Sequence, residues 1–495
     1  MRALRLAGRF SVSARGARNS GRGFSIHLVS RCQGGATGAT PASRLQRVRT
    51  LIVGHGGRES ALATRMAEHS ELHAIVGHEN PTILARCAES GGGHVVGDVC
   101  DPAAVAALAR EREIDIAMVS ADEPLAAGVV DALLAQGTRA VGPTRDGAEI
   151  EWNKVFARSL LSEIAPEAVP RLHVVSDEAE LQRAITDFGS TPLAVKPAGL
   201  TGGKGVKVMG PHLADHDAAR DYARELLSRG GAGESVLIEE RIDGAEFTIQ
   251  AISDGRTVVF PPSTYDYPYR FDGDEGPGTG GMGSLSVASP ILPFMTPEHY
   301  REACSIIAAV IERLGALGRR FNGIMNSGFF ATADGVKVIE FNARFGDPEC
   351  MNIMSLFDGS WSEVMERITA GELSDSDVPL REEASLVLYL VSPDYALRPG
   401  GPYEFPLDVA AIEADGSRVF FSSAVQAEPG RFRTVGTSRA VALATTAPAL
   451  DDARRRLQGW AERVPLLEWR RDVGDGAYLD GLTRLVAAEG AHAPG

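Results

Sequence analysis

The chain has 495 residues, 44% of them hydrophobic, and a formal net charge of −15 at pH 7. This length and composition are typical of a globular protein with several domains. The acidic balance argues against the clustered Lys and Arg that bind nucleic acid, and no apolar run of about 18 residues indicates a membrane span. Five scattered cysteines without a CxxC pair indicate reduced structural thiols. We therefore expect small-molecule partners, and we expect a monomer.

Residues 1–49 differ in kind from the rest of the chain. The first 50 residues hold ten arginines, no lysine and no acidic residue, and the first carboxylate is Glu59. A basic leader that can form an amphipathic helix, as Met1 to Phe10 can, is typical of a transit peptide. The pattern predicts import into a mitochondrion or plastid. The alternative is a disordered basic arm or a misassigned start codon, in which case the protein is cytoplasmic.

Residues 50–150 alternate apolar strands with amphipathic helices. Strands are expected at 51–54, 73–77 and 114–120, with helices between them. This alternation predicts a parallel, Rossmann-like βαβ domain that ends near Pro143.

A second α/β region is expected at residues 151–383. Strands at 193–200 and 235–241 frame a helix near 215–228, and a strand–turn–strand at 328–342 precedes a helix after Asp347. Residues 255–300 are rich in Gly and Pro and predict a long functional loop. A small mixed domain is expected at 384–485, followed by a tail at 486–495. The predicted fold class is therefore α/β and α+β, in several domains.

The segment 196–206 ends an apolar strand in a lysine and continues as a loop with four glycines and a second lysine, Lys204. Glycines let backbone N–H groups approach phosphate oxygens, and lysine adds a point charge. The spacing differs from a Walker A loop because Lys204 is followed by Gly205. A plain turn is as good an interpretation of the loop alone, but Lys196 at a strand end favours an anionic partner.

The segment 338–349 places Glu340 and Asn342 two residues apart on a strand, so that both project from one face while Ile339 and Phe341 pack behind. Mg²⁺ needs few protein oxygens when nucleotide phosphate and water fill its other positions. The alternative is a solvated strand face. Arg344 would serve as a guanidinium clamp on a phosphoryl group or a carboxylate.

Two further segments are candidates. The turn between Glu239 and Glu246 could present backbone to an adenine edge and Glu246 to ribose hydroxyls, although single acids are more often surface charges. The loop Gly54–Glu59 follows a strand and opens a helix, where N–H groups can meet a phosphate. It lacks the dinucleotide fingerprint because Glu59 stands where glycine is needed, so a phosphorylated sugar is the better candidate ligand.

These segments resemble the glycinamide ribonucleotide synthetase (phosphoribosylamine–glycine ligase) family of the ATP-grasp superfamily. Five motifs of this family occur in order, and their amino-acid sequences are most similar to those of the archaeal branch. They lie at Gly54–Glu59, Pro124–Asp131, Gly199–Val206, Gly276–Gly283 and Glu340–Glu349.

The resemblance implies an N-terminal domain, an ATP-grasp core with a mobile lid at about 165–240, and a C-terminal domain. It implies ligation of glycine to 5-phosphoribosylamine through glycyl phosphate, with ATP as substrate and Mg²⁺, or Mn²⁺ in its place, as cofactor. ATP would be bound by Lys154, Lys196, Gly202, Gly203, Lys204, Glu239, Arg241 and Glu246. The metal would be held by Glu340 and Asn342. The ribose phosphate would be bound by Gly54, Gly56, Gly57, Arg58 and Glu59. Glycine and its acyl phosphate would be surrounded by the catalytic residues Asp266, Arg344 and Asp347 together with Thr279, Gly280 and Gly281.

The chain departs from the family pattern on the acceptor side. Tyr265-Asp266-Tyr267-Pro268 stands where many members have Gln-Asp-His-Lys, so a lysine and a backbone donor are lost. Ser60 replaces a histidine after the first loop, and Glu79-Asn80-Pro81-Thr82 replaces a Pro-Gly-Asn-x-Gly turn. Two alternatives therefore stay open: an ATP-grasp ligase with another carboxylate and amine, and a non-catalytic nucleotide-binding relative.

Overall fold

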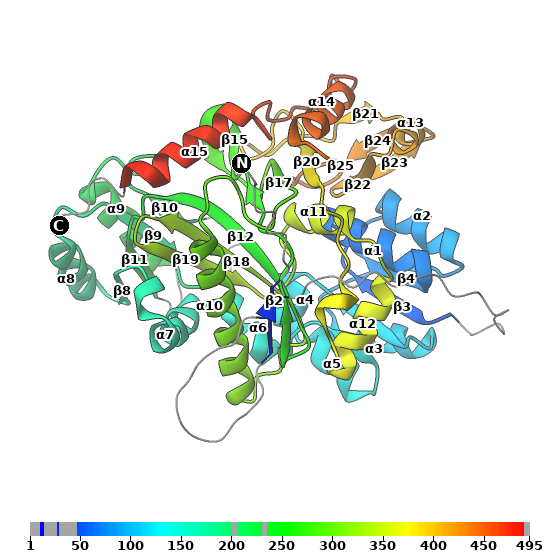
Figure 1. Ribbon diagram of the computed structural model, residues 1–495, viewed down its shortest axis with the longest axis horizontal. Coiled ribbons are helices and arrows are strands. Elements are labelled where there is room, and N and C mark those ends of the chain that lie inside the picture. Colours follow the sequence, from blue (N-terminus) through cyan, green and yellow to red (C-terminus); the bar gives the residue numbers. More distant parts are fainter. Residues whose placement is uncertain (1–9, 14–26, 29–46, 200–204, 230–234, 490–495) are drawn as a thin grey trace, which may run out of the picture.

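The structure is a computed structural model of the whole chain. It describes residues 10–13, 27–28, 47–199, 205–229 and 235–489. Figure 1 shows an N-terminal domain, a central antiparallel sheet, a small lid sheet at one end and a C-terminal sheet at the other. No helix in the described ranges is long and apolar enough to cross a membrane.

The N-terminal domain is a five-stranded sheet in which every neighbouring pair is parallel, in the order β5-β4-β3-β6-β7. Most residues of β3, β4 and β6 are apolar and buried, because helices cover the sheet. The carboxyl ends of parallel strands meet at one edge, so the loops after β3, β4 and β6 lie together. The strands are β3 (Arg49–Val53), β4 (Glu71–Val76), β5 (His94–Val96), β6 (Ile116–Val119) and β7 (Arg139–Val141), and the helices are α1 (Gly57–His69), α2 (Pro81–Ser90), α3 (Pro102–Glu111), α4 (Asp122–Ala127), α5 (Val129–Ala135) and α6 (Arg145–Trp152).

The central sheet is antiparallel, with the order β19-β18-β12-β13-β1-β2. Helix α10 lies along it, and its buried apolar face joins the main core. Most of the basic leader lies outside the described residues, but two short pieces of it form strands that extend this sheet from β13. The elements are β1 (Phe10–Ser13), β2 (His27–Leu28), β12 (Ala245–Ser253), β13 (Thr257–Val259), β18 (Gly323–Thr332), β19 (Gly335–Asn342), α7 (Lys154–Ile164), η1 (Pro166–Ala168) and α10 (Pro297–Ala316).

The region predicted to be the lid, for which we keep that name, contains a separate antiparallel sheet in the order β10-β9-β11-β8, covered by two helices. It has its own apolar core, from Val175 to Ile238, that is distinct from the two larger ones. A separate core is what a subdomain needs in order to move as a unit. The elements are β8 (Leu172–Val175), α8 (Glu178–Phe188), β9 (Leu193–Pro197), β10 (Lys207–Val208), α9 (His216–Arg229) and β11 (Val236–Glu240).

The C-terminal sheet combines strands from both sides of residue 384, in the order β14-β17-β20-β25-β22. Two strands of the predicted long loop at 255–300 thus belong to a sheet, so the expectation of a long irregular loop is wrong. The domain division itself stays a prediction. The elements of this region are β14 (Tyr265–Asp266), β17 (Gly283–Ser286), α11 (Glu349–Leu356), α12 (Trp361–Ala370), η3 (Asp375–Asp377), β20 (Ala384–Leu390), β21 (Glu404–Pro406), α13 (Val409–Ala414), β22 (Arg418–Phe421), β23 (Ala424–Glu428), β24 (Arg431–Thr434), β25 (Val441–Ala447) and α14 (Leu450–Ala461).

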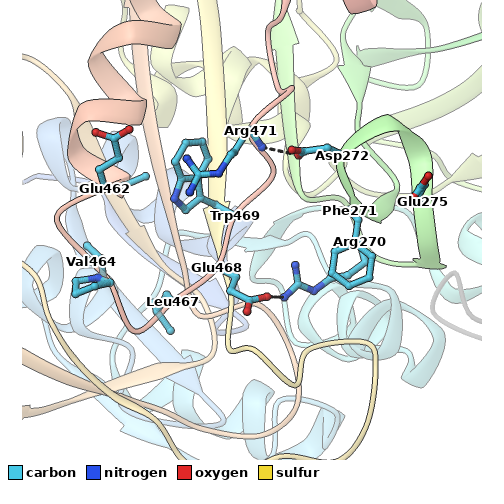
Figure 2. A pocket seen from close by; sticks show the side chains of 12 residues that line it. Arg270, Phe271, Asp272, Glu275, Glu462, Val464, Leu467, Glu468, Trp469 and Arg471 are labelled. Carbon is cyan, nitrogen blue, oxygen red and sulfur yellow. Dashed lines mark hydrogen bonds and ion pairs between the residues drawn. The ribbon is translucent and has the colours of Figure 1, made fainter.

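A hairpin packs against the C-terminal arm that leads into α15 (Gly476–Glu489). The hairpin consists of β15 (Tyr269–Phe271), η2 (Asp272–Asp274) and β16 (Glu275–Gly278). Figure 2 shows the surface pocket between them, where the Arg471 backbone N–H donates to Asp272 at 2.7 Å and Arg270 pairs with Glu468. The arm therefore holds the hairpin through these two contacts.

Arg470 is the buried charge of this contact. Its guanidinium is 1% exposed, forms two bonds to Asp472 at 2.6 and 2.7 Å and one to Asp274 at 3.0 Å. Removing one partner of a buried pair leaves the other charges uncompensated. We expect Arg470→Met to lower the free energy of unfolding by about 3 kcal/mol, measured by urea denaturation.

The exposed Arg433→Met on β24 is the matched control, and it should change the free energy of unfolding by less than about 0.5 kcal/mol. Equal stability of the two variants would contradict the structural role of Arg470.

Candidate active site

A cleft lies where the N-terminal domain, the lid, the central sheet and the C-terminal sheet meet. It has two adjoining parts that share Glu151, Lys154, Val206 and Glu340. We call them the lysine recess, lined among others by Arg158, Lys196 and Glu239, and the acidic recess, lined among others by Asp266, Asn326, Asp347, Glu349 and Arg439. The strands β9, β11 and β19 thus bring together segments that are far apart in the sequence.

The lysine recess is built around Glu239 on β11. Its carboxylate accepts from Lys196 Nζ at 2.6 Å and from two nitrogens of Arg158 at 2.7 and 3.0 Å. Burial alone would raise the pKa of Glu239, but the charges of Lys196 and Arg158 outweigh it and lower the pKa to about 2. Glu239 therefore positions Lys196 from behind rather than offering a free carboxylate to a ligand.

Arg158 on α7 is a functional neighbour that sequence reasoning missed. It also donates to the backbone oxygens of Val338 and Ile339 at 3.1 and 2.9 Å, so one guanidinium joins the lid to β19, the strand that carries Glu340. A lone arginine within a helical pattern carries no sequence signal for this contact.

Lys154 begins α7 and donates from Nζ to the carbonyl oxygen of Gly199 at 2.9 Å. Burial lowers its pKa. It thus faces the start of the predicted phosphate loop. Gly202, Gly203 and Lys204 of that loop lie outside the described residues, so their predicted role stays a prediction.

Glu340 and Asn342 lie side by side at the end of β19. The Asn342 amide nitrogen donates to Glu340 at 3.2 Å, and its amide oxygen accepts from Arg344 at 3.2 Å. A bulge in the β18–β19 register falls at Ile339. Phe341 packs into the main core behind the pair, as expected, and Ile339 and Phe341 also line the lysine recess.

The donor set of this pair fits Mg²⁺, because it offers one carboxylate and one amide oxygen and Glu340 forms no ion pair among the described residues. The described residues hold no group of three or more His, Cys, Asp or Glu side chains placed around one metal. A cation here would therefore depend on ligand phosphates and water for its remaining positions.

Glu151 at the end of α6 was also missed. This carboxylate is 8% exposed, pairs with Arg344 Nε at 3.1 Å and accepts from the Ala343 backbone N–H at 2.8 Å. It holds Arg344 in the wall of the acidic recess, and the role of Arg344 as a clamp stays a prediction. The acid lies on a helix flank with no motif of its own.

The N-terminal loop is folded on its own glutamate. Glu59 accepts from the Gly56 N–H and from Arg58 Nε, both at 2.7 Å, and is 2% exposed. Arg58 extends to the carbonyl oxygen of Phe345 at 2.9 Å. A Cβ on Gly57 would lie 2.2 Å from the hydroxyl of Tyr389, so only glycine fits there. Gly54 completes the turn with a φ of +126°, which favours glycine.

Ser60 and Asn80, which both depart from the family pattern, form a hydrogen bond with each other. Ser60 donates to the Phe421 carbonyl at 2.6 Å and to Asn80 at 3.1 Å, while the Asn80 amide donates to the carbonyls of His55 and Phe421 at 2.8 and 2.7 Å. Asn80 is fully buried and also caps α2. The loop is therefore tied to the C-terminal sheet.

Asp347 is held by two domains at once. Its carboxylate accepts from the Arg58 backbone N–H at 3.3 Å and the Tyr389 hydroxyl at 2.7 Å, and it pairs with Arg439 at 3.1 Å. Burial alone would raise its pKa, but Arg439 and Arg58 keep the pKa of Asp347 below its usual value. Asp347 is thus a charged anchor.

Arg439 is the third residue that sequence reasoning missed. It donates to the backbone oxygens of Gly280, Gly281 and Asp347, the last two at 2.9 Å. Thr279 closes the same loop by donating to the Pro268 carbonyl at 2.9 Å. The loop 279–281 and Asp347 are therefore brought together, as expected.

Asp266 lies at the end of β14, and its neighbours explain the Tyr-Asp-Tyr-Pro sequence. Tyr267 is fully buried and accepts from the Gly474 N–H at 2.9 Å, and Tyr265 contacts the Tyr478 hydroxyl at 2.7 Å. Both tyrosines thus attach Asp266 to the C-terminal arm. Burial and the negative charge of Glu349 raise the pKa of Asp266 well above its usual value.

Two predicted ATP residues do not line the cleft. Arg241 donates to the Met209 carbonyl at 3.1 Å and pairs with Asp243 at 2.8 Å. Glu246 lies on β12, where burial of the carboxyl group and the negative charges of Asp274 and Glu340 raise its pKa to about 7. Their predicted roles stay predictions.

Comparison with known proteins places this cleft in a family. Residues 48–151 match the model of the phosphoribosylglycinamide synthetase N domain, and residues 152–350 match its ATP-grasp (A) domain. The phosphoribosylamine–glycine ligase of Thermococcus kodakarensis is 40% identical over 442 residues, which cover 89% of this chain and 99% of that protein. The chain belongs to this family.

Other relatives agree. The phosphoribosylamine–glycine ligase of the archaeon Methanococcoides burtonii is 39% identical over 86% of this chain and 95% of its own length. The crystal structure of the Thermotoga maritima phosphoribosylamine–glycine ligase superposes with a TM-score of 0.70 at 23% identity, covering 86% of this chain and all of that one. The biotin carboxylase domain of a Hydrogenobacter thermophilus 2-oxoglutarate carboxylase superposes with a TM-score of 0.62 at 15% identity. The superposition covers 90% of this chain and 98% of that one. These structures share the ATP-grasp fold.

The Glu239 contacts predict a pH-dependent stability. A carboxyl whose pKa falls from 4.5 to about 2 on folding contributes stability above pH 4.5 and loses it as the pH falls to about 2. We expect Glu239→Gln to lower the free energy of unfolding by about 3 kcal/mol at pH 7, because Lys196 and Arg158 lose their counter-charge. The difference from wild type should shrink between pH 4.5 and 2.

Glu240→Gln, on the next residue of β11, is the matched control and should change little. A Glu239→Gln effect that stays constant from pH 7 to 2 would rule out the ionic origin of the stabilisation. Denaturant unfolding at a series of pH values measures the free energy of unfolding of the two variants and of wild type.

Proposed function

We propose that the protein ligates glycine to 5-phosphoribosylamine with ATP, giving glycinamide ribonucleotide, ADP and phosphate, a step of purine biosynthesis. The observation that carries this proposal is one cleft in which Lys154, Lys196 and the Glu340–Asn342 pair lie beside a glycine loop at a helix N-terminus, in a chain of this family. The lysine recess suits nucleotide phosphates, and the loop Gly54–Glu59 suits the ribose phosphate.

The chemistry needs positioning and charge neutralisation rather than a protein nucleophile. The glycine carboxylate attacks the γ-phosphorus to give glycyl phosphate, and the ribosylamine nitrogen then displaces phosphate. Lys154 and Lys196 neutralise phosphate oxygens, and Arg344, fixed by Glu151, stabilises the charge that develops on the transferred group.

Glu340 and Asn342 would hold Mg²⁺, or Mn²⁺ in its place, which when bound neutralises phosphate charge. Their oxygens already lie side by side, and Arg344 orients the Asn342 amide. We further propose that the enzyme is monomeric, which light scattering of the purified protein tests.

An assay of ADP release tests the substrates. Purified enzyme with ATP, Mg²⁺, glycine and freshly made phosphoribosylamine should release ADP only when all four are present. Activity with another amino acid and none with glycine would overturn the assignment and favour a different ligase of the same fold. A lack of activity with every combination would favour a non-catalytic relative.

The metal pair gives a mutational prediction. Glu340→Ala should lower kcat by at least about 10³-fold, since an interaction with the transferring phosphoryl group is lost, while the thermal midpoint stays within about 2 °C. Glu428→Ala, an exposed acid on β23, should match wild type in both measurements. Retained turnover in Glu340→Ala would remove Glu340 from the metal site.

The basic leader at 1–49 gives a prediction of location. We propose that it directs import into a mitochondrion or plastid, because its composition is rich in arginine and lacks acids. A fusion of residues 1–50 to a fluorescent reporter should accumulate in the organelle, and replacing its arginines by glutamine should abolish this. A cytosolic signal from the unaltered fusion would defeat the claim.

A further inference from the structure

Four carboxylates that line the acidic recess form no ion pair among the described residues, namely Asp122, Glu340, Asp266 and Glu349, and the last two have the buried oxygens. Among the described residues neither Asp266 nor Glu349 forms an ion pair, in contrast to Asp347 between them in sequence and Glu239 in the other recess. Glu349 is 5% exposed, and Asp266 Oδ1 is buried without a hydrogen-bond partner. A buried, unpaired carboxylate is costly unless a cation or a proton joins it.

Asn326 adds a third free acceptor. It lines the same recess, is 4% exposed, and its Oδ1 is buried without a partner, while its Nδ2 lies 3.5 Å from Glu349 Oε1. Gln250, opposite it on β12, uses its amide oxygen to accept from the Gly346 N–H at 3.0 Å. The recess therefore presents three acceptor side chains, Asp266, Glu349 and Asn326.

Two glycines make room for these carboxylates. Gly281 has a φ of +101°, and a Cβ there would lie 2.4 Å from Asp266 Oδ1. A Cβ on Gly346 would lie 2.4 Å from Glu349 Oε2. Any side chain at either position would displace a carboxylate, so the backbone is shaped around the acceptors.

The cations that line the recess are engaged elsewhere. Arg439 directs its terminal nitrogens to the carbonyls of Gly280 and Gly281 and to Asp347, and only its Nε lacks a partner. Arg344 pairs with Glu151. Carboxylates outnumber cations in the lining of the recess, so a cationic ligand complements it. The carboxylates are Asp122, Glu151, Asp266, Glu340, Asp347 and Glu349, and the cations are Arg58, Lys154, Arg344 and Arg439.

We propose that Asp266, Glu349 and Asn326 bind the ammonium group of the amino-acid substrate. A primary ammonium has three donors, no acceptor and one positive charge, and so satisfies three acceptors and compensates the carboxylates. This inference rests on the proposed function and adds the residues that recognise the amine end of glycine. The Glu340–Asn342 pair lines the same recess, so the carboxylate of a bound glycine, two carbons from its nitrogen, stays close to the groups that act on phosphate.

Kinetics of the full-length enzyme test the proposal. A double variant, Asp266→Asn with Glu349→Gln, keeps the shape of both side chains and removes both negative charges. It should raise the KM for glycine about 100-fold, since hydrogen bonds between charged groups are lost. The KM for ATP should stay within about twofold. Asn326→Ala should raise the KM for glycine about tenfold. The matched control, Asp358→Asn combined with Glu363→Gln on the surface, should leave both KM values unchanged.

Glycolate, which carries a hydroxyl in place of the ammonium, gives a second readout. Wild type should prefer glycine over glycolate strongly, and the double variant should lose most of this preference. If the double variant has too little turnover, glycine binding in the presence of MgADP is measured by calorimetry, and loss of glycine binding with MgADP binding retained supports the proposal.

Three results would overturn it: an unchanged KM for glycine in the double variant, an unchanged glycine-to-glycolate preference, or a change confined to the Mg²⁺ dependence, which would make the recess a metal site. Failure of the proposed function is a separate result, since it is seen in wild type as ADP release that does not depend on glycine.

Discussion

The contact between Asp347 and Arg439 connects the parts on which the cleft depends. Asp347 lies between β19, which carries Glu340 and Asn342, and α11, and it accepts hydrogen bonds from the N-terminal loop and from Tyr389 of the C-terminal sheet. Arg439 adds the loop at 279–281 to the same point. Four regions distant in sequence thus meet at one buried ion pair, and losing either partner would separate the loop at 279–281 from the metal pair.

The charges around the cleft fall into two groups with different physical roles. Glu239, Glu151 and Asp347 are paired with arginine or lysine, and these pairs fix the position of the cations that face the ligand. Asp266 and Glu349 are left without ion pairs. Buried pairs add little net stability compared with apolar packing, but they fix geometry, whereas unpaired acids gain most when a cation binds. The site can therefore bind both negatively and positively charged groups of its ligands.

Much of the site could be predicted from the sequence because it lies in contiguous motifs. The alternation from residue 51 predicted the parallel sheet, and two-residue spacing predicted that Glu340 and Asn342 share a face. Arg158, Glu151 and Arg439 could not be predicted, since each acts through contacts 81 to 192 residues away in the sequence and none belongs to a motif. The predicted loop at 255–300 was wrong because one of its short strands, β17, pairs with β20 near residue 385, a contact that no local pattern reveals. Tyr265 and Tyr267 looked like lost function, yet they attach Asp266 to an arm more than 200 residues away.

Oxygen transfer from glycine to phosphate tests the central claim most directly. Glycine labelled with ¹⁸O in both carboxylate oxygens is incubated with the enzyme, ATP, Mg²⁺ and phosphoribosylamine, and the products are analysed by mass spectrometry. Attack of the carboxylate on the γ-phosphorus, followed by displacement of phosphate, requires one ¹⁸O in each released phosphate and one in the glycinamide ribonucleotide. Phosphate without ¹⁸O, together with ATP consumption that does not depend on glycine, would contradict the account.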